Sequence, residues 1–200
     1  MKPYPYHNNA LEVIARNVIM TYNPRLLTAP APIPVETIIE RVYGLTLDFQ
    51  FIRNNGRVLG ETVFEDAMVP IYEREGGGYK LLPVKAGTVI IDASLLDCRG
   101  DGRFRFTCAH ELAHWIIHKD YYTQLGETAA STVRSSEADS AIERQADCLS
   151  SHLLMPKGTV KMAFHRNRGK CKEIVPALAD TFGVSRKAME IRLTDMRLLP

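Results

Sequence analysis

The pentapeptide His110-Glu111-Leu-Ala-His114 carries the residues whose types and spacing are best suited to chemistry. Residues four apart on an α-helix lie about 40° apart around the axis and ~6 Å along it, so the two imidazoles project to one side and can share a metal ion. The glutamate beside the first histidine can then accept a proton from a metal-activated water without being a ligand itself. In a chain of this length and composition, His-Glu-x-x-His is expected by chance on the order of 0.01 times per chain.

The residues around the pentapeptide can bury such a helix. Six apolar side chains surround it: Phe104, Phe106, Ala109, Leu112, Ala113 and Ile116. The alternative is a surface helix with two incidental histidines and a Glu111–His114 pair three residues apart. The apolar context favours a buried helix and therefore a metal site.

A catalytic zinc with tetrahedral coordination takes a third protein ligand. Glu143 and Asp147 stand four residues apart on the next expected helix, so both carboxylates share one face. Glu143 could complete the metal site, while Asp147 could accept the free ring N–H of a ligand histidine and fix its tautomer. The competing continuation His-x-x-Gly-x-x-His, in which a third histidine is the remaining ligand, is absent. Ile117 stands at the position of the Gly and Asp120 at the position of the third His.

A solvated acidic face explains the carboxylates of this segment equally well in isolation. The apolar residues that follow require the helix to pack, which favours the ligand interpretation: Leu149, Leu153, Leu154 and Met155. If Glu143 is not the ligand, the carboxylates to consider instead are Asp120, Glu137, Asp139 and Asp147.

Four further side chains are candidates for polarising a substrate carbonyl, because attack of metal-activated water on a carbonyl needs a donor aimed at the developing oxyanion. They are His118, Tyr121, Tyr122 and His152. His118 lies four residues beyond His114, so it could line the cleft as a donor. Its side chain is rotated by ~80° around the helix axis relative to His110, so a peripheral polar contact is an equal alternative. The sequence does not distinguish the other three from packing residues, which is the favoured interpretation of each.

The composition is that of a globular chain without covalent cross-links. Of the 200 residues 46% are apolar and 24% are charged, enough for one compact domain or two small ones. The four cysteines, Cys98, Cys108, Cys148 and Cys171, have no CxxC spacing, which favours reduced thiols. No apolar run approaches ~20 residues and the first residues lack an apolar leader, so we expect no membrane association and a cytoplasmic location.

Hydrophobic periodicity predicts helices at both ends of the chain and a small, mostly antiparallel sheet between residues 45 and 92. Strands are expected at 45–51, 57–64, 68–72, 79–82 and 88–91. Helices are expected from Tyr6 to Asn23 and at 35–43, 103–118, 137–154, 157–165, 171–182 and 185–197. Residues 119–136, rich in Thr, Ser, Gly and Ala, are expected to form a long loop.

Basic residues are concentrated at the C-terminal end. Residues 157–200 contain ten Lys or Arg against four Asp or Glu, a local charge of +6 in a chain of net charge +2. Residues 179–187 have the outline of a helix, a Gly183 turn, a Ser185 N-cap and a second helix, as in a helix-turn-helix. Direct DNA contact is one interpretation, and a helical hairpin beside a solvated basic loop is the other. The family resemblance described next favours the hairpin, as part of the active-site domain; docking of an acidic protein substrate is a further use of the basic surface.

In their order along the chain, these motifs resemble the ImmA/IrrE family of zinc metallo-endopeptidases. The resemblance covers about residues 80–200 and rests on Arg103-Phe-Arg-Phe-Thr, the pentapeptide, Glu143-Arg-Gln-Ala-Asp147, Leu153-Leu-Met-Pro156, Phe182-Gly-Val-Ser185 and Ile191-Arg-Leu193. It implies one Zn²⁺ per chain, held by His110, His114 and Glu143, with Glu111 as the catalytic base. Many members have Asn at the position of Asp147.

We therefore expect an α+β fold in a single metallopeptidase-like domain over residues 1–200. Helices and the small sheet occupy 1–100, zincin-like zinc-binding helices occupy 101–156, and a helix-turn-helix-like hairpin lies within the helical segment 157–200. The resemblance implies a zinc-dependent endopeptidase that cleaves a regulatory protein such as a transcriptional repressor. The alternatives are a DNA-binding regulator and a non-catalytic adaptor or antitoxin that keeps the zinc fold.

A substrate peptide is expected to lie antiparallel to an exposed strand, because main-chain pairing holds a peptide independently of its side chains. Residues Thr88–Asp92 are the preferred template for this pairing.

Overall fold

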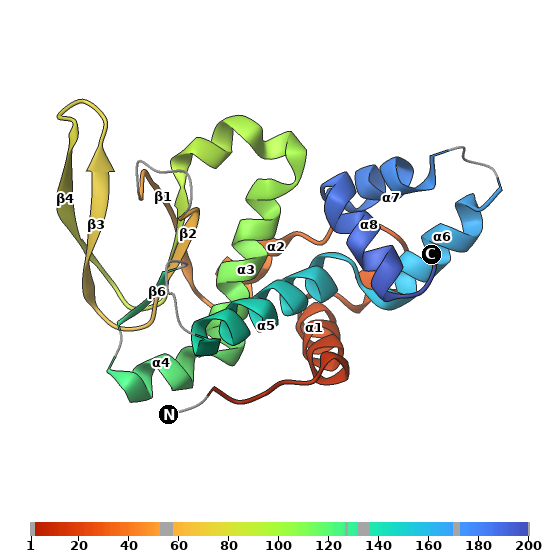
Figure 1. The fold of residues 1–200 in the computed structure, drawn as a ribbon, viewed down its shortest axis with the longest axis horizontal. Helices are drawn as coiled ribbons and strands as arrows, with labels where there is room; N and C mark the ends of the chain where they lie inside the picture. Colours follow the sequence, from red (N-terminus) through yellow and green to blue (C-terminus); the bar gives the residue numbers. More distant parts are fainter. Residues whose placement is uncertain (1–2, 53–57, 127, 132–136, 170–172, 200) are drawn as a thin grey trace.

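The computed structural model describes residues 3–52, 58–126, 128–131, 137–169 and 173–199. It has the expected α+β architecture, with strands at one end, helices in the middle and a helical C-terminal group at the other end (Figure 1). The helices are α1 (Asn8–Tyr22), α2 (Val35–Arg41), α3 (Arg103–Ile117), α4 (Lys119–Leu125), α5 (Glu137–Leu154), α6 (Lys157–Asn167), α7 (Ile174–Phe182) and α8 (Arg186–Asp195), with 3₁₀ turns at Pro24–Leu27 and Ala93–Asp101. The strands are β1 (Thr46–Gln50), β2 (Gly60–Val63), β3 (Ala67–Glu73), β4 (Gly78–Val84), β5 (Thr88–Asp92) and β6 (Ala129–Ser131).

The strands form two sheets. The larger has the order β1-β5-β2-β6, and the smaller is the β3–β4 hairpin, which stands away from the helices in Figure 1. Strands β1 and β5 are parallel, whereas the other three pairs are antiparallel, so the expectation of a mostly antiparallel arrangement is confirmed. The parallel pair was not expected, because short apolar runs do not encode strand direction.

The choice of Thr88–Asp92 as a template for substrate is wrong. These residues form β5, which lies inside the sheet between β1 and β2, and all five are buried. Both of its edges are already paired with neighbouring strands, so no peptide can add to it. A continuous Val-Ile-Ile run is typical of a strand covered on both faces, and this signal argues against an exposed edge.

The segment 119–136 is not the structureless loop that its composition predicts. It begins with α4, because Tyr122 is buried and stacks on Phe64 with 5.2 Å between the ring centroids. It continues through β6, which pairs antiparallel with β2 so that Ala130 stands opposite Thr62. Both elements depend on partners far away in sequence, which local composition does not reveal.

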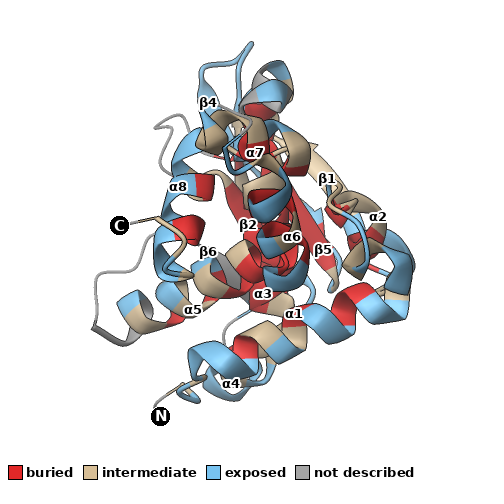
Figure 2. Ribbon diagram, turned by 90° about the vertical axis from the view of Figure 1, so that its right-hand side faces the viewer, coloured by how far each residue is buried: buried red, intermediate tan, exposed pale blue. Residues whose placement is uncertain are grey.

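Helix α3 lies at the centre of the molecule. It packs against α5 on one side and against β2 and β5 on the other, and Figure 2 shows buried residues concentrated where these elements meet. The main core cluster extends from Leu11 in α1 to Leu193 in α8. Burial is therefore deepest around the helix that carries the two histidines.

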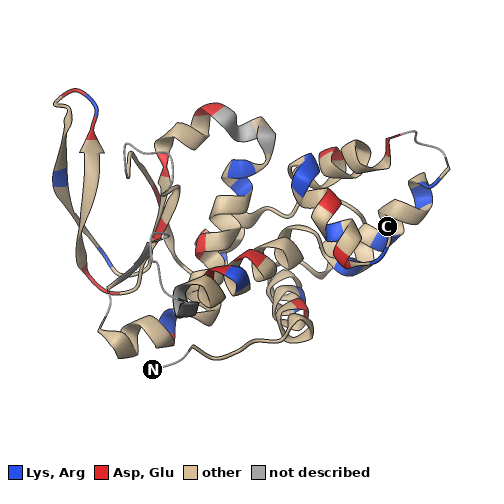
Figure 3. Cartoon of the chain, in the orientation of Figure 1, with Lys and Arg blue, Asp and Glu red and all other residues tan. Residues whose placement is uncertain are grey.

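The C-terminal helices follow the predicted pattern. Gly183 ends α7 in the left-handed conformation, with φ of 63°, and the Ser185 hydroxyl caps α8 by accepting from the Ala188 N–H at 3.1 Å. Figure 3 shows basic residues on α6 and α8. Arg192 does not contribute to this basic surface, since it is 3% exposed and donates to Glu12 at 2.9 and 3.2 Å.

Two features of the described residues bear on the remaining sequence expectations. None of their helices is both long enough and apolar enough to span a membrane. Cys108 and Cys148 are reduced cysteines, whereas the side chains of Cys98 and Cys171 lie outside the described part of the structure.

Candidate metal centre

Helix α3 presents both histidines of the pentapeptide to the interior. The helix starts after Gly102, which has φ of 79° and approaches α8 so closely that a Cβ there would lie 2.5 Å from the Ser185 nitrogen. From Arg103 it runs unbroken to Ile117, so the spacing of four residues places His110 and His114 on one face. Their exposed fractions are 8% and 2%.

Glu143 on α5 meets the two histidines. His110 Nε2 lies 3.0 Å from Glu143 Oε2 and 3.0 Å from His114 Nε2, and His114 Nε2 lies 3.5 Å from Glu143 Oε1. One ligand atom from each of the three residues lies within 4.8 Å of the other two. The structure thus brings together the three side chains that the sequence predicts as metal ligands.

Each histidine also has a partner on its other ring nitrogen. Asp147 Oδ1 lies 3.0 Å from His110 Nδ1, so a proton on Nδ1 leaves the Nε2 lone pair directed toward Glu143 and His114. His118 Nδ1 lies 3.1 Å from His114 Nδ1, and its Nε2 lies 3.4 Å from Gln145 Oε1. Asp147 and His118 therefore orient the two imidazoles from behind.

Glu111 is held beside this cluster without joining it. Its side chain is 1% exposed, and Thr62 Oγ1 in β2 lies 2.7 Å from its Oε2 and 2.9 Å from its carbonyl oxygen. The one hydroxyl hydrogen can be donated to only one of these oxygens at a time. Burial raises the pKa of the Glu111 carboxyl to about 7, with the negative charges of Glu143 and Glu61 adding to the rise. A carboxyl with a pKa near neutrality suits a group that both accepts and returns a proton.

The charges at the three candidate ligands show what the cluster attracts. Burial lowers the pKa of His110, but hydrogen bonds with Asp147 and Glu143 outweigh burial and raise the pKa to about 10. Burial raises the pKa of Glu143. Hydrogen bonds with His110 and His114 lower this pKa by more than burial raises it, so the pKa lies below its usual value. Burial lowers the pKa of His114, which favours its neutral form, so the site stabilises one positive charge, on His110 beside the Glu143 carboxylate. Because binding of a divalent cation to such a donor set displaces protons, the residues fit a metal ion.

The remaining candidates lie elsewhere. Tyr122 is buried in an apolar cluster with Phe64, and Tyr121 packs against this cluster. The ring centroids of Tyr122 and His114 are 6.3 Å apart. His152 lies about two and a half turns beyond Glu143 on α5. It is buried and contacts Asn8, Glu12 and Cys148. The structure does not bring His152 to the two histidines. Asp120 is exposed on α4, and the side chains of Glu137 and Asp139 lie outside the described residues.

Two residues in β2 that position Glu111 were not predicted from the sequence. One is Thr62, and the other is Gly60, where an added Cβ would lie 2.4 Å from Glu111 Oε1. A glycine within a strand signals close approach of another group, so Gly60 was the available clue. Nothing local to Thr62 indicates that it reaches a residue 49 positions away.

Two histidines one helical turn apart, completed by a glutamate from a second helix, form a donor set used by catalytic zinc in peptidases. The fold is accordingly of the zinc metallopeptidase type. The family model for the IrrE N-terminal-like domain, a peptidase family, matches residues 95–194, half of the chain. The chain belongs to this family.

Other comparisons concern the fold alone. A solved structure described as a Mycobacterium tuberculosis transcriptional regulator matches with a TM-score of 0.54 and 15% sequence identity. The match covers 94% of this chain and 48% of that one, so this chain spans about half the length of the regulator. No curated protein matches the sequence.

Proposed function

We propose that this chain is a zinc-dependent endopeptidase. The observation that carries the proposal is the convergence of His110, His114 and Glu143 to within 4.8 Å, with buried Glu111 beside them. These three side chains would hold one Zn²⁺, and Asp147 and His118 would keep the imidazoles in place. When bound, zinc supplies Lewis acidity, which makes water acidic near neutral pH and polarises a peptide carbonyl.

Glu111 performs the proton transfers of the reaction. Its carboxylate accepts a proton from water as the water oxygen bonds to the peptide carbonyl carbon. The bond between carbon and nitrogen then breaks, and Glu111 returns the proton to the departing amine. One water is consumed, and a new carboxyl and a new amino terminus are formed. Thr62 holds the Glu111 side chain during both transfers.

The substrate proposed is a regulatory protein, such as a transcriptional repressor. Two observations support this class: membership of the IrrE N-terminal-like domain family, and the likeness in fold to a protein described as a transcriptional regulator. The basic residues of α6 and α8 would favour an acidic docking segment on such a protein.

Direct DNA binding is the weaker candidate. In a helix-turn-helix protein the outer face of the second helix enters the major groove. Here that helix would be α8, and its residues Lys187, Ala188, Ile191 and Asp195 line a cavity shared with α3 and α5. A duplex affinity that falls steeply with added salt would favour the DNA-binding alternative, whereas a slope near zero would exclude it.

The Glu111→Gln variant tests the proposed function. Glutamine keeps the shape of the side chain but cannot accept the proton, so we expect full zinc content and loss of peptide cleavage. Glu40→Gln, at an exposed position on α2, is the matched control and should cleave normally. Cleavage by Glu111→Gln at the rate of the unaltered protein would refute the mechanism.

A further inference from the structure

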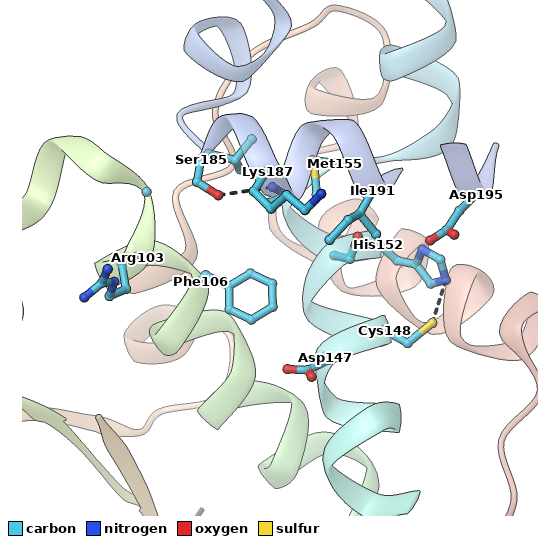
Figure 4. A pocket seen from close by; sticks show the side chains of 14 residues that line it. Arg103, Phe106, Asp147, Cys148, His152, Met155, Ser185, Lys187, Ile191 and Asp195 are labelled. Atoms are coloured by element: carbon cyan, nitrogen blue, oxygen red, sulfur yellow. Dashed lines mark hydrogen bonds between the residues drawn. The ribbon is translucent and has the colours of Figure 1, made fainter. Parts of the chain in front are cut away.

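A cavity of about 730 Å³ lies between α3, α5 and α8 (Figure 4). Volumes of this size are typical of sites that enclose a ligand. The N-terminal part of α3 forms one wall, the C-terminal half of α5 forms the floor, and α8 forms the opposite wall. The close approach of Gly102 to Ser185 fixes one end of the cavity, since α3 and α8 meet there through backbone atoms.

The lining of the cavity is mainly apolar. The apolar side chains that contribute to it are Phe106, Met155, Val184, Ala188 and Ile191. Met155 and Val184 are buried, whereas Ile191 is 50% exposed although it is a large apolar residue. In Figure 4 the Phe106 ring points into the cavity from α3. Apolar surface left open in this way is usually covered by a bound partner.

Two polar groups of the floor, Cys148 and His152, carry no charge near neutral pH. Cys148 Sγ and His152 Nε2 lie 3.3 Å apart, and Asn8 Oδ1 accepts from the Cys148 thiol at 3.1 Å. Burial raises the pKa of the Cys148 thiol. Burial and the nearby Arg192 lower the pKa of His152 to about 4. On the wall, the Lys187 ammonium is already paired with Glu190 at 2.8 Å. The other charged residues of the lining, Arg103, Asp147 and Asp195, are exposed to solvent. The buried part of the cavity is therefore suited to an uncharged, apolar occupant.

The cavity adjoins the metal centre, although none of its lining residues is a candidate ligand. Asp147 lines the cavity, and its Oδ1 lies 3.0 Å from His110 Nδ1. Phe106, also in the lining, has its ring centroid 6.5 Å from that of His110. The cavity therefore lies beside the proposed catalytic site, on the side of His110 where Phe106 and Asp147 stand.

We propose that this cavity is the specificity site of the peptidase and binds large apolar side chains next to the scissile bond. The inference rests on the proposed function and adds the substrate class: proteins cleaved within an exposed apolar segment. Phe106 and Ile191, on opposite walls, are the residues that contact these side chains.

Cleavage of a peptide library tests the proposal. For the unaltered zinc-loaded protein we expect Phe, Leu, Ile or Met to be enriched at one position beside the cleaved bond. Ile191→Trp partly fills the cavity and should lower the ratio of kcat/KM for a Phe peptide to that for the matching Ala peptide at least tenfold. Thr194→Trp adds the same bulk at an exposed position of α8 outside the lining and should leave the ratio unchanged. An unaltered ratio in Ile191→Trp, or the absence of apolar enrichment, would overturn the proposal.

A binding measurement separates this proposal from the proposed function. A dansyl-labelled Phe-Leu-Phe amide, titrated into Glu111→Gln protein, should bind at least tenfold more weakly after Ile191→Trp is added, and equally well after Thr194→Trp is added. If this difference appears but the unaltered protein cleaves nothing, the cavity is a binding site and the catalytic proposal fails. If the protein cleaves peptides but Ile191→Trp changes neither binding nor specificity, the cavity proposal fails alone.

Discussion

Gly60 of β2 lies directly against Glu111 of α3: a Cβ added to Gly60 would stand 2.4 Å from Glu111 Oε1 and 2.6 Å from its Cγ. The glutamate cannot simply swing away, because its side chain is buried and Thr62 holds Oε2 from the same strand. The sheet and the helix therefore fix the position of this carboxylate together. A strand residue without a side chain is part of the geometry of the site.

The substitution Gly60→Ala should therefore impair catalysis more than metal binding. The added methyl group displaces the Glu111 carboxylate, and a displacement of about 1 Å can cost on the order of 100-fold in rate. We expect kcat to fall by about this factor while zinc content, measured by mass spectrometry, is unchanged. Gly78→Ala in β4 is the control, since nothing lies within 4 Å of a Cβ at that position. Unchanged kcat in Gly60→Ala would contradict this account of the glutamate.

Asp147→Ala should weaken zinc binding without removing a ligand. Loss of the carboxylate that holds His110 Nδ1 frees the ring to rotate and to change tautomer, and losses of this kind typically cost 10–100-fold in metal affinity. Because the Asp147 side chain is 57% exposed, we expect the lower end of this range. Competition with a chelator of known affinity measures the change. Asp180→Ala, at an exposed position on α7, should bind zinc as tightly as the unaltered protein; equal affinity in the two variants would show that Asp147 does not support His110.

Buried His152 should make the chain less stable in acid. Burial and the charge of Arg192 on α8 lower its pKa to about 4; Lys157 acts in the same direction, while Glu12 on α1 opposes them. In the unfolded chain the histidine titrates near its usual pKa of about 6.5. The unfolded state therefore binds a proton first as pH falls. The contribution of His152 to stability is complete above pH ~6.5 and is lost as pH falls from there toward about 4.

Urea unfolding at a series of pH values measures this effect. Between pH 6.5 and 4 the free energy of unfolding should fall more steeply in the unaltered protein than in His152→Gln, by up to about 1.4 kcal/mol per pH unit. His165→Gln, at an exposed position on α6, should retain the steeper slope. Parallel curves for the unaltered protein and His152→Gln would mean that His152 does not titrate as its burial implies.

The parts of the site that were predicted from sequence are those whose positions depend on the geometry of a single helix. The spacing of His110 and His114, and of Glu143 and Asp147, defines a face of a helix by local geometry alone. The resemblance to a known family then supplied the pairing of the two helices. Helix α3 and the N-cap at Ser185 were expected for the same local reasons.

The parts that were missed depend on contacts between distant elements. Composition predicted a loop where Tyr122 forms a helix by stacking on Phe64, and periodicity could not show that β5 has neighbours on both sides. The contact of Thr62 with Glu111 and the burial of Arg192 against Glu12 each join residues far apart in the chain. A count of basic residues therefore overstated the charge available for DNA.

Zinc content of the Glu143→Ala variant tests the central claim most directly. In the proposed metal centre, His110, His114 and Glu143 bind one ion together. The purified chain, dialysed against buffer with trace zinc, should retain about one zinc per chain, and Glu40→Ala on the surface of α2 should behave identically. Glu143→Ala should retain far less than one zinc while remaining folded by circular dichroism. One tightly held zinc per chain in Glu143→Ala would contradict the proposed metal centre.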